Sequence, residues 1–186
     1  NGSTLTEIAN IDYGYEAQSV AWRPDGKYLA FAGYDPNNGY ELQCYSFDGT
    51  TLTELTNAHI DYNDNYLASV DWSPDGQYLA IGGDTPTNGY ELQCYSFDDT
   101  NNTLTELTNA RIDYGSELQS VAWSPNGNYL ALGGGGPGAG HDDVEIYSFD
   151  GTNLTQIETK DHGTRAYSVA WNANGNYLAV GGNNSN

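Results

Sequence analysis

The sequence has no methionine, two cysteines, and five Lys and Arg residues against 25 Asp and Glu. The net charge of -20 leaves no basic stripe to displace counterions from phosphates, so we expect neither nucleic acid nor a membrane surface as a partner. Apolar runs are only a few residues long, so no transmembrane helix is predicted, and no targeting segment is visible. Because residue 1 is not methionine, we expect a processed product or part of something longer.

Charged residues make up only 16% of the chain, and aromatic residues 13%, with 16 Tyr and four Trp. A disordered acidic tail would have the opposite balance, with dense charge and few aromatic side chains. The composition therefore predicts a folded chain with a packed core.

The four tryptophans mark an internal repeat. They are spaced 50, 51 and 48 residues apart, within the phrases SVAWRPDGKYLA, SVDWSPDGQYLA, SVAWSPNGNYLA and SVAWNANGNYLA. The phrase GYELQCYSFD is identical at 39–48 and 89–98, and TLTELTNA is identical at 51–58 and 103–110. Self-similarity at this period indicates a repeat architecture, so we treat residues 1–186 as a single array. Its repeats are centred on Trp22, Trp72, Trp123 and Trp171.

Each repeat is expected to form four short strands. SVAW and the following YLA segment are joined by Asp-Gly or Asn-Gly, which favour tight hairpins. The ELQCYSFD segment and the alternating TLTEL segment supply the third and fourth strands. The sequence therefore predicts an all-β fold, a β-propeller of four-stranded antiparallel blades with four blades per chain. A further outer strand is expected near the N-terminus, at about residues 2–9.

The repeated phrases resemble the WD-repeat (WD40-like) propeller family over essentially the whole chain. Asp161-His162 lies where the family has its Gly-His pair. The name-giving Trp-Asp dipeptide is replaced by Tyr-Ser, so the family's usual network of His, Ser or Thr, Trp and Asp cannot form in its usual composition. The chain is thus identified as a divergent member, with Tyr-Ser at 45–46, 95–96 and 147–148.

Four blades are fewer than the roughly seven that the resemblance implies for a closed ring. An open array leaves strand edges and an apolar blade face exposed, and these favour association. Two interpretations remain open: a half-propeller that pairs with a second copy to give about eight blades, or a fragment of a longer propeller.

Few residues indicate chemistry. Cys44 and Cys94 occupy a position that is Ile146 in the third repeat, so we expect buried thiols rather than a disulfide. The histidines lie at unlike repeat positions without zinc-ligand spacing. We therefore predict no catalytic residue, no metal site and no cofactor. Calcium or glycan binding through acidic and aromatic loops stays open as an alternative.

The resemblance implies that ligands bind at one end of the ring. The loops before the inner strands and those after the second strands meet there, and they carry tyrosines and carboxylates that suit a basic segment. An inner-strand acid, Asp71, replaces the alanine of the other repeats and is a candidate for the central channel. The candidate binding residues are Tyr15, Glu16, Tyr34, Asp35, Asp64, Tyr66, Asp84, Glu117, His141, Asp142, Arg165 and Tyr167.

The sequence therefore favours a non-enzymatic scaffold that binds a protein or peptide, expected to be basic, at this end. The first alternative is a structural half-propeller that forms a homodimer without any selected ligand. The second is the calcium or glycan site.

Overall fold

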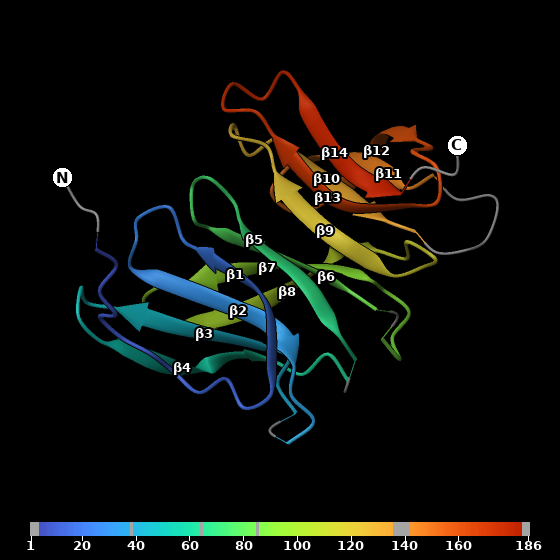
Figure 1. Cartoon of the computed structure of the whole chain (residues 1–186). Coiled ribbons are helices and arrows are strands. Elements are labelled where there is room, and N and C mark those ends of the chain that lie inside the picture. Colours follow the sequence, from blue (N-terminus) through green and yellow to red (C-terminus); the bar gives the residue numbers. More distant parts are fainter. Residues whose placement is uncertain (1–3, 38, 64, 85, 136–141, 184–186) are drawn as a thin grey trace.

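The computed structural model describes residues 4–37, 39–63, 65–84, 86–135 and 142–183. Their strands form three four-stranded antiparallel sheets and one two-stranded sheet, as Figure 1 shows. The described part of the chain contains no helix of the length and apolarity needed to cross a bilayer. The strands are β1 (Glu16–Trp22), β2 (Tyr28–Tyr34), β3 (Leu42–Phe47), β4 (Leu52–Ile60), β5 (Leu67–Trp72), β6 (Tyr78–Gly83), β7 (Leu92–Asp98), β8 (Thr103–Ile112), β9 (Leu118–Trp123), β10 (Tyr129–Gly134), β11 (Val144–Phe149), β12 (Leu154–Lys160), β13 (Arg165–Trp171) and β14 (Leu178–Asn183).

The sheets are propeller blades arranged in chain order. Within each complete blade the strands pair in sequence, from β1 to β4, β5 to β8 and β9 to β12. The inner strands β1, β5, β9 and β13 contact one another in turn, so the blades follow each other around a common centre (Figure 1). The all-β, four-stranded blade architecture predicted from the repeats is confirmed. The prediction of four blades is refined to three complete blades and a two-stranded fourth in the described residues.

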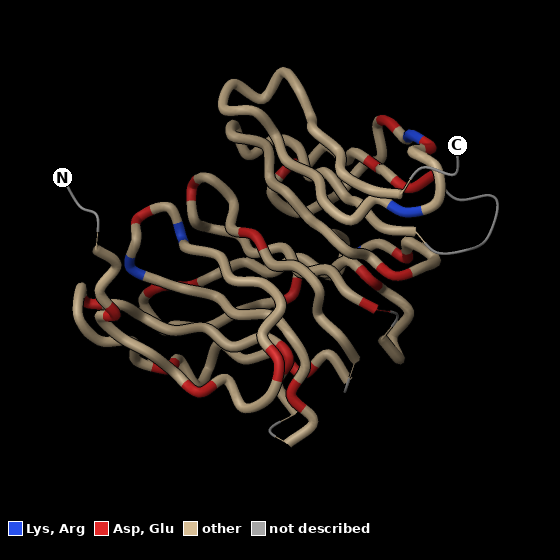
Figure 2. The backbone as a smooth tube through the Cα atoms, in the orientation of Figure 1, with Lys and Arg blue, Asp and Glu red and all other residues tan. Residues whose placement is uncertain are grey.

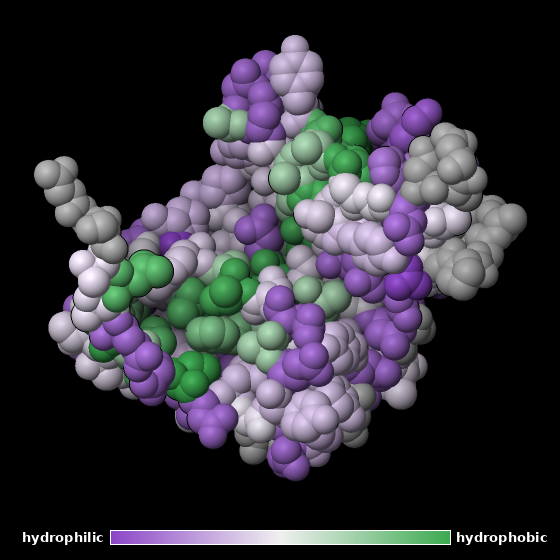
Figure 3. Space-filling model, in the orientation of Figure 1, coloured by the Kyte–Doolittle hydropathy of each residue, from purple (hydrophilic) through white to green (hydrophobic). Residues whose placement is uncertain are grey.

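The N-terminal strand expected at about 2–9 is absent from the described residues 4–9. An outer strand needs a third strand as its pairing partner, and the sheet of β13 and β14 has none in the described chain. Residues 6–11 instead line an apolar groove on the first blade, against Trp22 and Phe31. Figure 3 shows this apolar area beside the N-terminal segment.

The hairpin between the first two strands of each blade has one conformation throughout. Its glycine has a positive φ of 70° at both Gly26 and Gly76, which a glycine adopts without strain. The preceding Asp25 and Asp75 accept hydrogen bonds from backbone N–H groups two residues on, each at 3.0 Å. Some of the acidic residues of the chain therefore serve to stabilise turns.

A serine on each inner strand joins neighbouring blades. The Ser69 hydroxyl oxygen accepts a hydrogen bond from the backbone N–H of Val121 at 3.1 Å. The same bond links Ser19 to Val70 at 3.2 Å, and Ser120 to Val169 at 3.1 Å. The recurring SVAW phrase thus encodes the joint between blades as well as the inner strand.

A tyrosine–glutamine–carboxylate network replaces the family's usual network. In the second blade, the Tyr95 hydroxyl donates to Gln93 Oε1 at 2.7 Å, and the Tyr62 hydroxyl donates to the Glu91 carbonyl at 2.9 Å. The buried Glu91 carboxylate accepts the backbone N–H of Tyr114 at 2.7 Å, in the loop that enters the third blade. The Tyr-Ser substitution therefore comes with its own set of satisfied buried polar groups.

Both cysteines are buried free thiols, as predicted. Cys44 and Cys94 lie on β3 and β7, in the first and second blades. Burial raises the pKa of the Cys44 thiol to about 12, so it stays protonated and unreactive near neutral pH.

Candidate functional site

Three tyrosines from the first two blades gather at the predicted binding end. The rings of Tyr15 and Tyr34 meet edge to face, with centroids 5.8 Å apart, and Tyr34 stacks on Tyr66 with centroids 5.9 Å apart. We call Tyr15, Tyr34 and Tyr66 the tyrosine cluster. Tyr15 is two-thirds exposed, so the cluster presents aromatic surface to solvent.

An acidic hollow of about 460 Å³ adjoins the tyrosine cluster. Gln18 Nε2 donates a hydrogen bond to the Tyr66 hydroxyl at 2.5 Å, which fixes one wall. Burial and, secondarily, a hydrogen bond with Glu16 raise the pKa of Tyr66 to about 12, so its hydroxyl is neutral near pH 7. The lining residues are Gln18, Tyr66, Ala68, Asp84, Glu117 and Gln119.

The far wall of the hollow is charge-paired. Arg165 on β13 forms an ion pair with Glu117 at 2.9 Å, and its guanidinium lies 5.9 Å from the ring of Tyr167. Glu117 is therefore matched by a cation of the neighbouring blade, and Glu16 and Asp84 lie exposed near the tyrosine cluster. The structure thus places Tyr15, Glu16, Tyr34, Tyr66, Asp84, Glu117, Arg165 and Tyr167 at this end.

Other predicted residues are not part of this surface. The side chain of Asp35 is fully buried and accepts the backbone N–H of Asn37 at 3.0 Å, so it holds its own loop and faces no ligand. Asp142 is half-buried, and its carbonyl accepts the Tyr114 hydroxyl at 3.3 Å. Asp64 and His141 lie outside the described residues.

Asp and Glu positions are distributed along the whole described backbone (Figure 2). Within the described ranges, no group of three or more His, Cys, Asp or Glu side chains is placed to hold a metal ion. The exposed Asp48, Asp98 and Asp150 each cap a turn between third and fourth strands, by accepting backbone N–H groups. Hydrogen bonds lower the pKa of all three carboxyls, chiefly those from backbone N–H groups at Asp48 and those from the side chains of Asn101 and Asn153 at Asp98 and Asp150.

Asp71 on the inner strand β5 joins two blades. Its Oδ2 accepts the backbone N–H of Trp123 on β9 at 2.7 Å. Burial raises the pKa of the Asp71 carboxyl to about 6, although hydrogen bonds from the backbone N–H groups of Trp123 and Trp72 act in the opposite direction. In the described structure, this candidate channel residue contributes an inter-blade hydrogen bond.

The raised pKa of Asp71 predicts a specific pH dependence. Below about pH 4 the carboxyl is protonated in both the folded and unfolded states, so its burial costs little. Between about pH 4 and pH 6 the unfolded carboxyl ionises while the folded carboxyl stays protonated, so the unfolded state is favoured and stability is lost; above about pH 6 the carboxyl is ionised in both states and the loss levels off. We expect the free energy of unfolding to fall by about 2 kcal/mol more in the wild type than in Asp71→Asn between about pH 4 and pH 7, measured by urea denaturation. Parallel pH curves for the two proteins would contradict this assignment.

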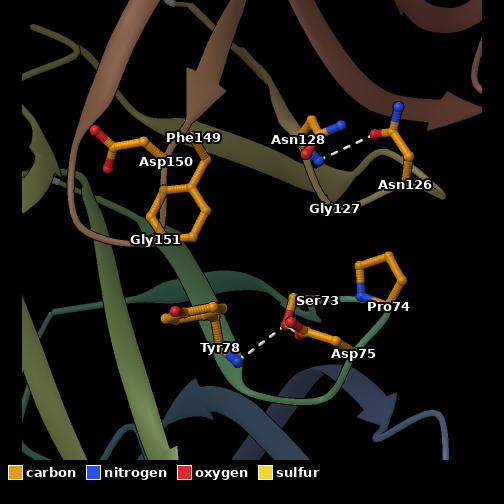
Figure 4. A pocket seen from close by; sticks show the side chains of 10 residues that line it. All are labelled: Ser73, Pro74, Asp75, Tyr78, Asn126, Gly127, Asn128, Phe149, Asp150 and Gly151. Carbon is orange, nitrogen blue, oxygen red and sulfur yellow. Dashed lines mark hydrogen bonds between the residues drawn. The ribbon is translucent and has the colours of Figure 1, made fainter.

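A second cavity, of about 490 Å³, lies between the second and third blades (Figure 4). It is formed at the β5–β6 and β9–β10 hairpins, the opposite end of the strands from the tyrosine cluster. Sequence reasoning missed it because its walls come from three segments that lie between Ser73 and Gly151 and are far apart in the sequence. The available signal was the change from Arg23 to Ser73 at equivalent positions of the first two repeats.

Comparison with known proteins agrees with this architecture. The family model for the WD domain, G-beta repeat, matches residues 49–85 and 152–186. These two segments of the chain match the WD repeat. Proteins built from WD repeats generally serve as protein-interaction scaffolds. No curated protein sequence matches the chain significantly.

Solved propeller structures are similar to the WD-repeat array over most of its length. A chain of the Mitotic Checkpoint Complex is 23% identical, with a TM-score of 0.66 over 89% of this chain and 46% of its own. Sqt1 of Chaetomium thermophilum, bound to the N-terminus of the ribosomal protein L10, is 19% identical, with a TM-score of 0.68 over 93% and 45%. A Bacteroides uniformis protein provisionally assigned as a 6-phosphogluconolactonase is 17% identical, with a TM-score of 0.67 over 88% and 46%.

These likenesses show the fold alone. The chain spans less than half the length of each of these solved structures. The array described here is therefore a partial propeller.

Proposed function

We propose that the WD-repeat array is a non-enzymatic scaffold that binds a basic protein segment at the tyrosine cluster and the adjoining acidic hollow. The observation that carries this proposal is the joint placement of three tyrosines and exposed carboxylates at one end of the blades. Tyrosine is enriched in binding surfaces because its ring contributes large contact area and its hydroxyl a hydrogen bond. The structure of Sqt1 supports the proposal, since this propeller of similar fold binds the N-terminus of a ribosomal protein.

Electrostatics favour a basic segment. The chain carries a net charge of -20, which attracts cationic segments over a distance set by the ionic strength. Glu16 and Asp84 supply carboxylates near the tyrosine cluster. A lysine or arginine entering the acidic hollow would also compete with Arg165 for Glu117, which are 2.9 Å apart.

We expect short Lys- and Arg-containing peptides to bind and acidic peptides of equal length not to bind. Tyr66→Ala should weaken binding about tenfold, because Tyr66 forms part of both the stack and the wall of the hollow. Raising NaCl from about 0.05 to 0.3 M should weaken binding as well. Fluorescence anisotropy of labelled peptides measures both effects.

Tyr177→Ala is the matched control for this experiment. Tyr177 is 72% exposed and lies in the hairpin of the fourth blade, away from the tyrosine cluster. This variant should bind the basic peptides as the wild type does. Equal losses in both tyrosine variants, or binding that does not depend on salt, would overturn the proposal.

We propose as a second candidate that the array self-associates through its two end blades. At the joint between the third and fourth blades, a side chain at Gly133 would meet Val169 and Ala166. Gly181 is the corresponding position of the fourth blade and faces open space. The first blade carries Ala17 and Val20 at the positions of Ala166 and Val169, and Val20 is 57% exposed.

The serine joint supports the same candidate. Ser168 corresponds to Ser120, whose hydroxyl accepts the N–H of Val169, and Ser168 is exposed. If the first blade of a second copy packs against the fourth blade of this copy, the backbone N–H of its Val20 can donate a hydrogen bond to the Ser168 hydroxyl oxygen. A further blade of a longer propeller would present the same groups to the exposed face of the fourth blade. The mass of the 186-residue chain in solution distinguishes the two cases, because only self-association gives twice the mass of one chain.

A further inference from the structure

The cavity between the second and third blades has an occupied counterpart within the same chain. The corresponding space between the first and second blades is filled by the side chain of Arg23, which is only 11% exposed. Because the repeats are near-copies, the occupied space shows which chemical group suits the unoccupied one.

Arg23 is held by aromatic rings, a backbone carbonyl and carboxylates. Its guanidinium carbon lies 5.0 Å from the ring centroid of Tyr28 and 5.4 Å from that of Phe97. Nε donates a hydrogen bond to the carbonyl of Gly76 at 2.9 Å. Nη2 pairs with Asp99 at 3.1 Å, and Nη1 with Asp25 at 3.4 Å. The guanidinium thus combines cation–π contacts with charge-assisted hydrogen bonds.

The open cavity has the same aromatic frame. Tyr78 and Phe149 occupy the positions of Tyr28 and Phe97, with centroids 4.9 Å apart and an angle of 81°, against 5.0 Å and 70° for the occupied pair. Figure 4 shows the two rings on one side of the cavity and the two hairpins on the other. Ser73 stands where Arg23 stands in the first repeat, so the side chain that would fill the space is missing.

The polar groups of the frame are also largely retained. Gly127 corresponds to Gly76 and lines the cavity with its backbone. Asp75 corresponds to Asp25, and its carboxylate accepts the Ser73 hydroxyl at 2.6 Å and the N–H of Gln77 at 3.0 Å. Gly151 replaces Asp99, so one carboxylate is lost.

The net charge around the cavity is negative. Asp75 and Asp150 are among the lining residues, which include no Lys or Arg. Hydrogen bonds from Asn153 and Thr152 lower the pKa of Asp150, so it is ionised. In Figure 4 its carboxylate points away from the rings, so Asp150 contributes long-range attraction and Asp75 the near carboxylate.

We propose that this cavity binds the guanidinium group of an arginine side chain presented by a partner protein. A lysine ammonium is a poorer match, because a planar guanidinium stacks on aromatic rings and directs several N–H donors at once, whereas an ammonium is a compact, strongly hydrated charge. The site lies at the opposite end of the blades from the tyrosine cluster, so this proposal does not depend on the proposed function and can be tested separately.

The test uses the capped tripeptide acetyl-Gly-Arg-Gly-amide and its Lys counterpart, titrated into the isotopically labelled chain and followed by NMR. We expect the arginine peptide to shift the resonances of Tyr78, Phe149 and Gly127, with a dissociation constant of about 1 mM. The lysine peptide should bind at least about tenfold more weakly.

Three variants make the test specific. Ser73→Arg should fill the cavity as Arg23 fills its counterpart and abolish the shifts. Ser73→Asn should retain them, since the fourth repeat carries Asn172 at this position. Arg23→Ser should open a second site, so that the arginine peptide also shifts Tyr28 and Phe97.

Four results would overturn the proposal: no shifts with the arginine peptide, equal affinity for the lysine peptide, shifts that persist in a folded Ser73→Arg, or shifts confined to the tyrosine cluster. If Ser73→Arg does not fold, Arg23→Ser decides the question, because a second set of shifts supports the site and an unchanged response argues against it.

Discussion

Replacing Glu91 with alanine is expected to lower the free energy of unfolding by about 3–5 kcal/mol. Glu91 is 1% exposed, and its Oε2 accepts the backbone N–H groups of Tyr114 at 2.7 Å and Gly115 at 3.2 Å. Alanine would leave both donors without this acceptor at the point where the chain passes from the second to the third blade. Urea denaturation followed by tryptophan fluorescence measures the loss.

The control for this experiment is Glu91→Gln. Glutamine keeps the size and one acceptor oxygen but loses the charge, so we expect a cost of about 1–2 kcal/mol. The structure makes hydrogen bonding, rather than volume, responsible for most of the effect. Equal costs for the two variants would show that the buried charge itself, and not the acceptor, holds the loop.

This result would bear on why the Tyr-Ser substitution is tolerated. The sequence indicated only that the family's usual network is missing, because a dipeptide names the lost groups and not their replacements. Tyr95 and Gln93 lie two residues apart on β7, on one face of the strand, which brings the Tyr95 hydroxyl to Gln93 Oε1 at 2.7 Å. The ELQCY spacing is the signal from which this pair could have been found.

The blades were predictable because the strand and turn residues within each repeat agree with the repetition of the whole phrase along the chain. The inner strand, the hairpin and the second strand are specified by contiguous phrases, and Gly26 and Gly76 have the positive φ that the hairpin requires. The N-terminal strand was not predictable in this way. Residues 4–8 read TLTEI, close to the TLTEL of the outer strands, but an outer strand forms only where a third strand is present to pair with it.

The candidate site was predicted in part for a similar reason. Loop position alone placed Tyr15, Tyr34 and Tyr66 at one end, and the structure brings their rings together. Burial separates Asp35 from them, because a short polar side chain in a loop binds its own backbone before any ligand. The cavity beside Ser73 depends on which residues of adjacent blades meet, and this required the structure.

Trp72→Ala should destabilise the chain far more than Trp22→Ala, although both tryptophans lie in the same repeated phrase. Trp72 is 4% exposed and packs edge to face on Phe97, with centroids 5.3 Å apart. Trp22 packs on Phe47 at the same distance but is 50% exposed, because no blade covers it. We expect a loss of about 3–5 kcal/mol for Trp72→Ala and about 1 kcal/mol for Trp22→Ala, measured by urea denaturation of the dilute monomer.

The same pair of variants tests self-association. If a second copy covers the first blade, Trp22 becomes buried, so the cost of Trp22→Ala should rise with protein concentration while that of Trp72→Ala stays constant. Sedimentation velocity should then show a dimer for the wild type and a monomer for Trp22→Ala. The large negative charge of each copy opposes pairing, so added salt should favour the dimer, whereas it weakens the binding of a basic peptide. A monomer at every concentration and salt level would exclude the homodimer and leave the exposed face to another propeller segment.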